Sequence, residues 1–259
     1  MNQNENANEN DSDKGQLAVR FLGSGDAFGS GGRLQACISV RAADGHVLLD
    51  CGATSLVGLR RAGVDPGTVD AVLVSHLHGD HFAGIPFLVL DAQFGHRRRP
   101  LLVVGPPGVQ ERVVQAMEVL FPGSAATRRD FDLRFLELPE RAPRAVGPFT
   151  ISAYPVAHAS GAPAYGLRLA RGNTTIAYSG DTEWTDSLVD LARETDLFLC
   201  EAYFFDKAVR NHLSYATLAA HRDELGCRRL VLVHPSADML ARRAEVRDEI
   251  AEDGQTLIV

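Results

Sequence analysis

Cysteine is scarce in this sequence of 259 residues, and its placement argues against two kinds of covalent scaffold. The only cysteines are Cys37, Cys51, Cys200 and Cys227, and no two of them have Cys-x-x-Cys spacing. The spacing argues against a structural zinc knuckle, and the low density argues against a disulfide framework. We expect free, mostly buried thiols, as in a reducing cytoplasm.

Long apolar stretches and an excess of positive charge are also missing. No run approaches the roughly 20 apolar residues that a membrane-spanning helix needs, and Met1–Asn6 lacks the apolar segment of a secretory signal. We therefore expect a cytoplasmic protein without a membrane partner. The formal net charge of −7 argues against a general affinity for nucleic acid.

Short apolar runs alternate with turn signals from Leu17 onward. Residues 1–15, rich in Asn, Asp and Glu, predict a disordered tail, and residues 16–259 contain no long polar linker and predict a single domain. Strands are predicted at 17–22, 36–41, 46–49, 71–74, 101–104, 149–154, 165–169, 175–179, 197–200, 230–233 and 256–259. Helices are predicted at 82–90, 109–120, 188–193, 215–225 and 239–252. This order is typical of a layered α/β sandwich.

One short segment carries most of the candidate chemistry. The run from His76 to His81 directly follows an apolar strand and holds four potential metal ligands within six residues. His76 and His78 are two apart in an extended segment and point to the same side. Asp80 and His81 then stand where the next helix begins. This density of ligands predicts a metal site at the end of the strand.

Further donors are needed, because two metals take about seven ligands together with a bridging oxygen. Three polar residues stand at the ends of other apolar runs, namely His158, Asp181 and His234. Strand ends are where α/β folds place their sites. We therefore expect these three side chains to join the histidine run.

These segments together resemble the metallo-β-lactamase superfamily, and within it the ribonuclease Z-like phosphodiesterase branch. The resemblance spans about Val19 to His234. The segments that carry it are Phe21–Gly25, Leu48–Gly52, Ser75–His81, Ala164–Gly166 and Ser179–Thr182. In addition, Glu201-Ala202 and His212-Leu213-Ser214 are similar to the segments that assist proton transfer in that branch.

The resemblance implies an α/β fold in which four layers form an αββα sandwich, and it implies a division of ligands. The implied sets are His76, His78 and His158 for one metal, Asp80, His81 and His234 for the other, and Asp181 as a bridge. Nitrogen and oxygen donors without sulfur suit two Zn²⁺ ions, and also Mn²⁺. A bridging water would complete the site as hydroxide.

The implied reaction is hydrolysis of a phosphodiester. The metal-bridging hydroxide attacks phosphorus, and His212 protonates the leaving oxygen while Glu201 holds it in one tautomer. The catalytic residues expected are therefore His212, Glu201 and the ligand Asp80. Asp50 is expected to orient a ligating histidine from behind.

The chain departs from ribonuclease Z at one place. Those enzymes hold tRNA with a long flexible arm between the third-motif histidine and the bridging aspartate. Here His158 and Asp181 are only 23 positions apart, and a predicted hairpin around Gly172-Asn173 uses most of them. We therefore expect a small-molecule phosphodiester, rather than tRNA, as the substrate.

Other interpretations stay open. The same site could hydrolyse a lactone, a thioester or a β-lactam, and an iron-bound oxidoreductase or a regulatory metal-binding protein of this fold are further hypotheses. The Glu201 and His212 pair favours phosphodiesters, because an alkoxide leaving group needs a proton. The sequence does not decide between a monomer and a homodimer.

Some conspicuous residues are expected to be structural. Three histidines match no motif and are expected at the surface or in packing: His46, His96 and His221. The basic cluster His96–Arg99 is expected to be a solvated cap at a helix end. Arg33 could meet a substrate phosphate or form a structural ion pair.

Overall fold

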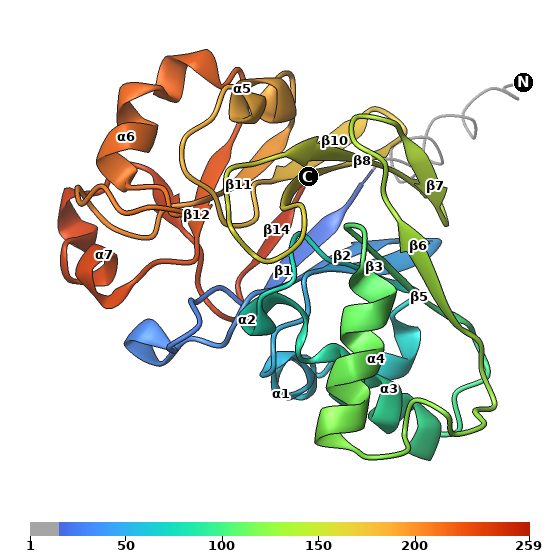
Figure 1. Cartoon of the computed structure of the whole chain (residues 1–259). Helices are drawn as coiled ribbons and strands as arrows, with labels where there is room; N and C mark the ends of the chain where they lie inside the picture. Colours follow the sequence, from blue (N-terminus) through green and yellow to red (C-terminus); the bar gives the residue numbers. More distant parts are fainter. Residues whose placement is uncertain (1–15) are drawn as a thin grey trace, which may run out of the picture.

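Two seven-stranded sheets face each other in the computed structural model, which describes residues 16–259 (Figure 1). The predicted tail over residues 1–15 lies outside the described residues. The strands are β1 Ala18–Gly23, β2 Cys37–Ala42, β3 Gly45–Leu49, β4 Ala71–Leu73, β5 Leu101–Gly105, β6 Leu133–Glu137, β7 Arg144–Val146, β8 Phe149–Pro155, β9 Tyr165–Arg171, β10 Thr174–Tyr178, β11 Leu197–Glu201, β12 Leu230–Val233, β13 Glu249–Ile250 and β14 Thr256–Ile258. The α-helices are α1 Ser55–Arg61, α2 Gly79–Phe82, α3 Ile85–Phe94, α4 Val109–Leu120, α5 Ser187–Ala192, α6 Tyr215–Ala220 and α7 Ala237–Ala241.

The sheets are the middle two of four layers, which confirms the expected αββα sandwich. One sheet has the order β14-β1-β2-β3-β4-β5-β6, and the other has the order β13-β12-β11-β10-β9-β8-β7. Helices α1, α3 and α4 lie on the first sheet, and α5, α6 and α7 lie on the second (Figure 1). No helix within residues 16–259 is long and apolar enough to cross a membrane.

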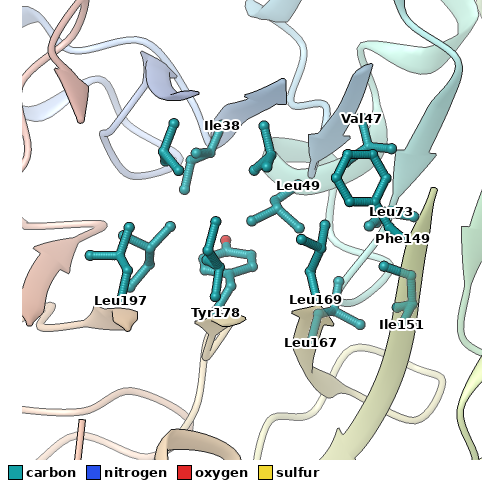
Figure 2. Packing of buried hydrophobic residues seen from close by; sticks show 14 of the residues in the cluster. Ile38, Val47, Leu49, Leu73, Phe149, Ile151, Leu167, Leu169, Tyr178 and Leu197 are labelled. Carbon is teal, nitrogen blue, oxygen red and sulfur yellow. The ribbon is translucent and has the colours of Figure 1, made fainter. Parts of the chain in front are cut away.

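The central core fills the space between the sheets. Figure 2 shows apolar side chains of the first sheet facing those of the second, including Ile38, Leu49 and Leu73 on one side and Ile151, Leu169 and Tyr178 on the other. Alternate residues of a strand point to opposite faces, so the other faces pack on the helices. Since both sheets share this core, we infer that residues 16–259 form one domain.

The predicted helix over residues 239–252 is wrong beyond its first turn. Helix α7 ends at Ala241, and Glu249–Ile250 instead forms β13, which pairs with β12 in parallel. Ile250 is buried against the helices on the second sheet. Pairing and burial therefore override the helical spacing of the apolar residues.

Both sheets deliver candidate site residues at the same edge of the sandwich. The run from His76 to His81 follows β4 in the first sheet. His158, Asp181 and His234 follow β8, β10 and β12 in the second sheet. The site therefore lies where the two sheets meet.

Candidate metal centre

Glycines allow the segment after β4 to pack closely against its neighbours. Helix α2 begins at Gly79, directly after His78, and carries Asp80 and His81. A Cβ atom added at Gly52 would lie 2.1 Å from the carbonyl oxygen of Asp80, a distance that no side chain tolerates. Only glycine fits this contact, which holds α2 against the segment that follows β3.

The first group of candidate ligands consists of His76, His78 and His158. One nitrogen from each of the three rings lies within 4.8 Å of the other two. The shortest distance, between His158 Nε2 and His78 Nδ1, is 2.9 Å. Two nitrogens on one tetrahedral zinc ion are about 3.3 Å apart, given Zn–N bonds of about 2.0–2.1 Å. The spacing of this group is thus close to that of a metal-bound set.

The second group consists of Asp80, His81, Asp181 and His234, again with ligand atoms within 4.8 Å of one another. The Nε2 atom of His234 lies 3.2 Å from Asp80 Oδ2 and 3.3 Å from His81 Nε2. Ring nitrogens of two histidines thus face each other at a distance that suits one shared cation.

Asp181 lies between the two groups and turns one oxygen toward each. Its Oδ1 atom lies 3.3 Å from His81 Nε2, and its Oδ2 atom lies 3.9 Å from His76 Nε2. Both Asp181 Oδ1 and His76 Nε2 are buried and have no hydrogen-bond partner. Buried polar atoms left unpaired cost free energy. These atoms fit metal cations, which would give each of them a partner.

Asp50 lies behind the second group, as the sequence analysis expected. Its Oδ2 atom lies 2.7 Å from His81 Nδ1 and also accepts hydrogen bonds from the hydroxyls of Ser75 and Tyr178. The backbone N–H of Ser75 donates to Oδ1. This carboxylate orients the His81 ring with Nε2 toward the site.

Sequence reasoning missed two partners of the candidate ligands. Tyr178 has a recognisable signal, because it points into the core from β10, in register with Ile176. The backbone carbonyl of Asn211 accepts a hydrogen bond from His158 Nδ1 at 2.7 Å. A backbone carbonyl leaves no sequence signal.

Glu201 and His212 form a pair beside the second group. The Nδ1 atom of His212 lies 2.5 Å from Glu201 Oε1. The other oxygen of Glu201 accepts the backbone N–H of Thr182 at 2.7 Å. Glu201 is fully buried, whereas the His212 side chain is 23% exposed. Thus Glu201 fixes one ring nitrogen of His212, and Nε2 is left for another partner.

Burial and neighbouring charges shift the pKa values of the site residues in different directions. Burial raises the pKa of Asp181, but His234 and His81 lower it further, so the net shift is well below its usual value. Burial lowers the pKa of His76, which keeps that imidazole neutral. Burial and the Asp181 charge raise the pKa of Glu201. Burial lowers the pKa of His81 and of His234, but the Asp181 charge outweighs burial and the net shift of both is upward. Ionised carboxylates and neutral imidazoles are the forms that bind a cation, so a bound cation would displace the protons of these two rings.

The histidines outside the motifs are structural, as expected. His46 is buried and its ring contacts the hydroxyls of Ser39 and Thr68. His96 is exposed. The ring of His221 stacks on Trp184 with centroids 4.0 Å apart.

Two arginines considered for phosphate or cap roles are buried in structural contacts. Arg33 forms an ion pair with Glu252 at 2.7 Å. The expectation of a solvated cap is wrong for Arg97, whose guanidinium donates to the carbonyls of Val69 and Pro100. None of these partners of Arg33 and Arg97 is a candidate metal ligand.

Comparisons with known proteins show the family and the fold of the chain. A family model described as anti-Pycsar protein Apyc1 matches residues 17–256. The ribonuclease Z of Methanosarcina acetivorans is 27% identical over 269 aligned residues, which cover 85% of this chain and 88% of that enzyme. Because the alignment is longer than this chain, that enzyme has segments that this chain lacks.

Two solved structures share the fold. The metallo-β-lactamase fold protein YhfI from Bacillus subtilis superposes with a TM-score of 0.79 at 22% identity, covering 95% of this chain and 100% of that one. The short form of human tRNase Z superposes with a TM-score of 0.74 at 24% identity, covering 93% and 98%. These similarities show the metallo-β-lactamase fold.

Proposed function

The chain belongs to the family described as anti-Pycsar protein Apyc1 and is a ribonuclease Z-like, metal-dependent hydrolase of the metallo-β-lactamase superfamily, and from this premise we propose that it cleaves a small phosphodiester. The observation that carries the proposal is the position of Asp181, with one oxygen toward each group of candidate ligands and with the Glu201–His212 pair alongside.

The proposed ligands are those that the resemblance implied. His76, His78 and His158 would hold one divalent cation, Asp80, His81 and His234 would hold a second, and Asp181 would bridge them. Zinc suits the donors, as does manganese. When bound, the cations supply a nucleophile at neutral pH by acidifying a water, and they offset the negative charge of the phosphate.

His212 acts as the general acid in this proposal. The acid form of the ring has a proton on both nitrogens: Nδ1–H donates to Glu201, which fixes the orientation of the ring, and Nε2–H supplies the proton for the leaving oxygen. A thiolate, the leaving group of a thioester, departs without this proton, whereas an alkoxide needs it. The pair therefore supports an oxygen ester such as a phosphodiester over a thioester.

The interval between His158 and Asp181 supports a small substrate. After a short loop, β9 and β10 form a hairpin whose last pair is Arg171 with Thr174, which leaves Gly172 and Asn173 as the turn. The loop, the hairpin with its turn, and the two residues Ser179 and Gly180 together account for the whole interval. We propose that a substrate such as a cyclic or dinucleotide phosphodiester binds without the arm that holds tRNA.

The test uses protein reconstituted with zinc or with manganese. We expect about two metal ions per chain by elemental analysis, with bis(p-nitrophenyl) phosphate and cyclic or dinucleotide phosphodiesters cleaved far faster than precursor tRNA. Turnover of lactone, thioester or β-lactam substrates in preference to phosphodiesters would refute the proposed substrate class. A single iron ion with oxygen consumption and no hydrolysis would refute the reaction itself.

Asp181→Asn is the matched variant for this test. It replaces one carboxylate oxygen by an amide nitrogen and removes the shared negative charge. The metal occupancy of both sites should therefore fall together. Loss of one metal with full retention of the other would contradict the proposed bridge.

A further inference from the structure

The imidazole of His212 is held on one edge and on one face. Glu201 fixes the position of Nδ1, but one hydrogen bond leaves the ring free to turn about the line that joins the two atoms. The ring of Tyr203 lies on the face of His212, with centroids 4.5 Å apart and planes at 29°. His158 meets His212 edge-on at 5.2 Å. The stacked face of Tyr203 thus limits the rotation that the hydrogen bond allows.

Tyr203 is itself fixed by the backbone around it. Its N–H donates to the carbonyl of Leu213, the neighbour of His212, at 2.9 Å. Its carbonyl accepts the N–H of Ser236 at 2.9 Å, two residues after the candidate ligand His234. The Tyr203 ring is therefore placed relative to both the general acid and the candidate metal centre.

Aromatic neighbours complete the support. Phe204 packs edge-on against the Tyr203 ring, with centroids 4.6 Å apart and planes at 77°. The Tyr203 ring also lies 5.7 Å from the ring of His234, and the rings of His212 and His234 are nearly parallel at 11°, with centroids 6.1 Å apart. Tyr203, His212 and His234 thus form a triangle of neighbouring rings, which sets the plane of His212 relative to the site.

The ring of Tyr203, rather than its hydroxyl, makes the contacts with the site. Within residues 16–259 the hydroxyl forms no hydrogen bond, whereas the ring touches His212, His234 and Phe204. A residue that acts through its ring face should tolerate loss of the hydroxyl and should not tolerate loss of the aromatic plane.

We propose that Tyr203 is a positioning residue whose ring holds the His212 imidazole with Nε2 directed at the leaving oxygen of the phosphodiester. This inference rests on the proposed function. In the reaction, a water oxygen loses a proton to solvent and forms a new bond to phosphorus, the bond to the leaving oxygen breaks, and the Nε2 proton moves to that oxygen. His212 then regains a proton from solvent. General acid catalysis contributes about 10²–10⁴ in rate and depends on this alignment.

The test compares Tyr203→Phe with Tyr203→Leu, because the first keeps the flat ring and the second keeps only apolar bulk. Each variant is assayed on methyl aryl phosphodiesters whose leaving phenols range from p-nitrophenol to unsubstituted phenol, and metal content is checked in every sample. We expect Tyr203→Phe to keep kcat within about twofold of wild type on all substrates. Tyr203→Leu should lose about 10–100-fold on the poorest leaving group and less than about threefold on p-nitrophenol, because only the former needs the proton.

His212→Ala separates failure of this inference from failure of the proposed function. If His212→Ala loses equal activity on good and poor leaving groups, the general acid role itself is wrong. If His212→Ala selectively loses the poor leaving groups and Tyr203→Leu does not, only the role of Tyr203 is wrong. Equal damage by Tyr203→Phe and Tyr203→Leu would also overturn it, because the hydroxyl would then matter. Should Tyr203→Leu fail to fold, Tyr203→Met also lacks the flat ring and gives the same comparison.

Discussion

Asp50 is a residue on which several parts of the site converge. It has a left-handed backbone, with φ of 58°, and its fully buried carboxylate contacts His81, Ser75 and Tyr178. A carboxylate can accept all of these hydrogen bonds, whereas an amide presents only one acceptor oxygen. The orientation of His81 therefore depends on the charge and shape of this one group.

We predict that Asp50→Asn weakens metal binding by about 10–100-fold, the usual effect of removing a partner behind a ligating histidine. Competition with a chromophoric chelator measures the affinity. Tyr178→Phe is the matched control, because it removes one donor to Asp50 and leaves His81 paired, and it should cost less. Metal affinity unchanged in Asp50→Asn would show that this carboxylate does not orient the ligand.

His46, remote from the candidate ligands, makes stability depend on pH. Burial, aided by the positive charge of Arg41, lowers the pKa of His46 from 6.5 to about 4. Between these values the unfolded chain binds a proton and the folded protein does not. The contribution of neutral His46 to the free energy of unfolding is therefore fully present above pH 6.5 and is lost as the pH falls toward 4.

We predict that acid destabilises the wild type by up to about 3 kcal/mol more than it destabilises His46→Gln over this range, from a shift of about 2.5 pKa units. Denaturant unfolding at pH 7 and at pH 4.5 measures both proteins. Loss of metals in acid affects both equally and cancels in the comparison. Parallel pH profiles would mean that His46 does not carry this dependence.

At the scale of elements, two glycines of the β9–β10 region have the same backbone conformation but different surroundings. Gly172 in the hairpin turn and Gly180 after β10 have φ of 56° and 60°. A Cβ atom at Gly172 meets nothing within 4 Å, whereas one at Gly180 would lie 2.9 Å from Cβ of Ser75. Ser75 in turn donates to Asp50.

We predict that Gly172→Ala costs about 1–2 kcal/mol, from left-handed strain alone, and leaves metal affinity unchanged. Gly180→Ala should cost about 2–4 kcal/mol, because crowding adds to the strain, and it should also weaken metal binding. Thermal unfolding and chelator competition on the two variants give the comparison. If Gly180→Ala lost no more stability and no more metal affinity than Gly172→Ala, the close packing of Gly180 against Ser75 would be contradicted.

The sequence allowed most elements of the sandwich to be predicted, because the apolar runs are short and end at turn residues. Strands such as β3 and β12 and the helix α4 lie where the runs predict them. Strand β6 was not predicted, because it is a half-exposed edge strand without clean alternation of apolar and polar residues. Arg97 was misjudged because its partners are carbonyl groups contributed by the chain near Val69, about 28 residues away.

At the scale of the whole molecule, the candidate ligands join the two sheets. Four of them come from the segment after β4, and three come from strand ends of the opposite sheet. Cations bound there would attach to both sheets of the folded protein and would find no such site in the unfolded chain. Metal binding should therefore stabilise the whole sandwich.

We predict that metal at 100 times its dissociation constant adds about 2.7 kcal/mol per site, which raises the melting temperature by about 5–10 °C for a protein of this size. Calorimetry with and without chelator measures the shift, and Asp181→Asn should reduce it. A melting temperature that does not respond to metal would contradict a site shared by the two sheets.

The placement of the candidate ligands also means that neither half of the polypeptide contains a complete metal site. The first half, up to β6, contributes His76, His78, Asp80 and His81, and the second half contributes the rest. Each half alone presents an incomplete chelate, because the third member of each histidine set lies in the other half. We therefore expect activity only when the two halves pack together, because a cation bound by these candidate ligands would contact residues of both halves.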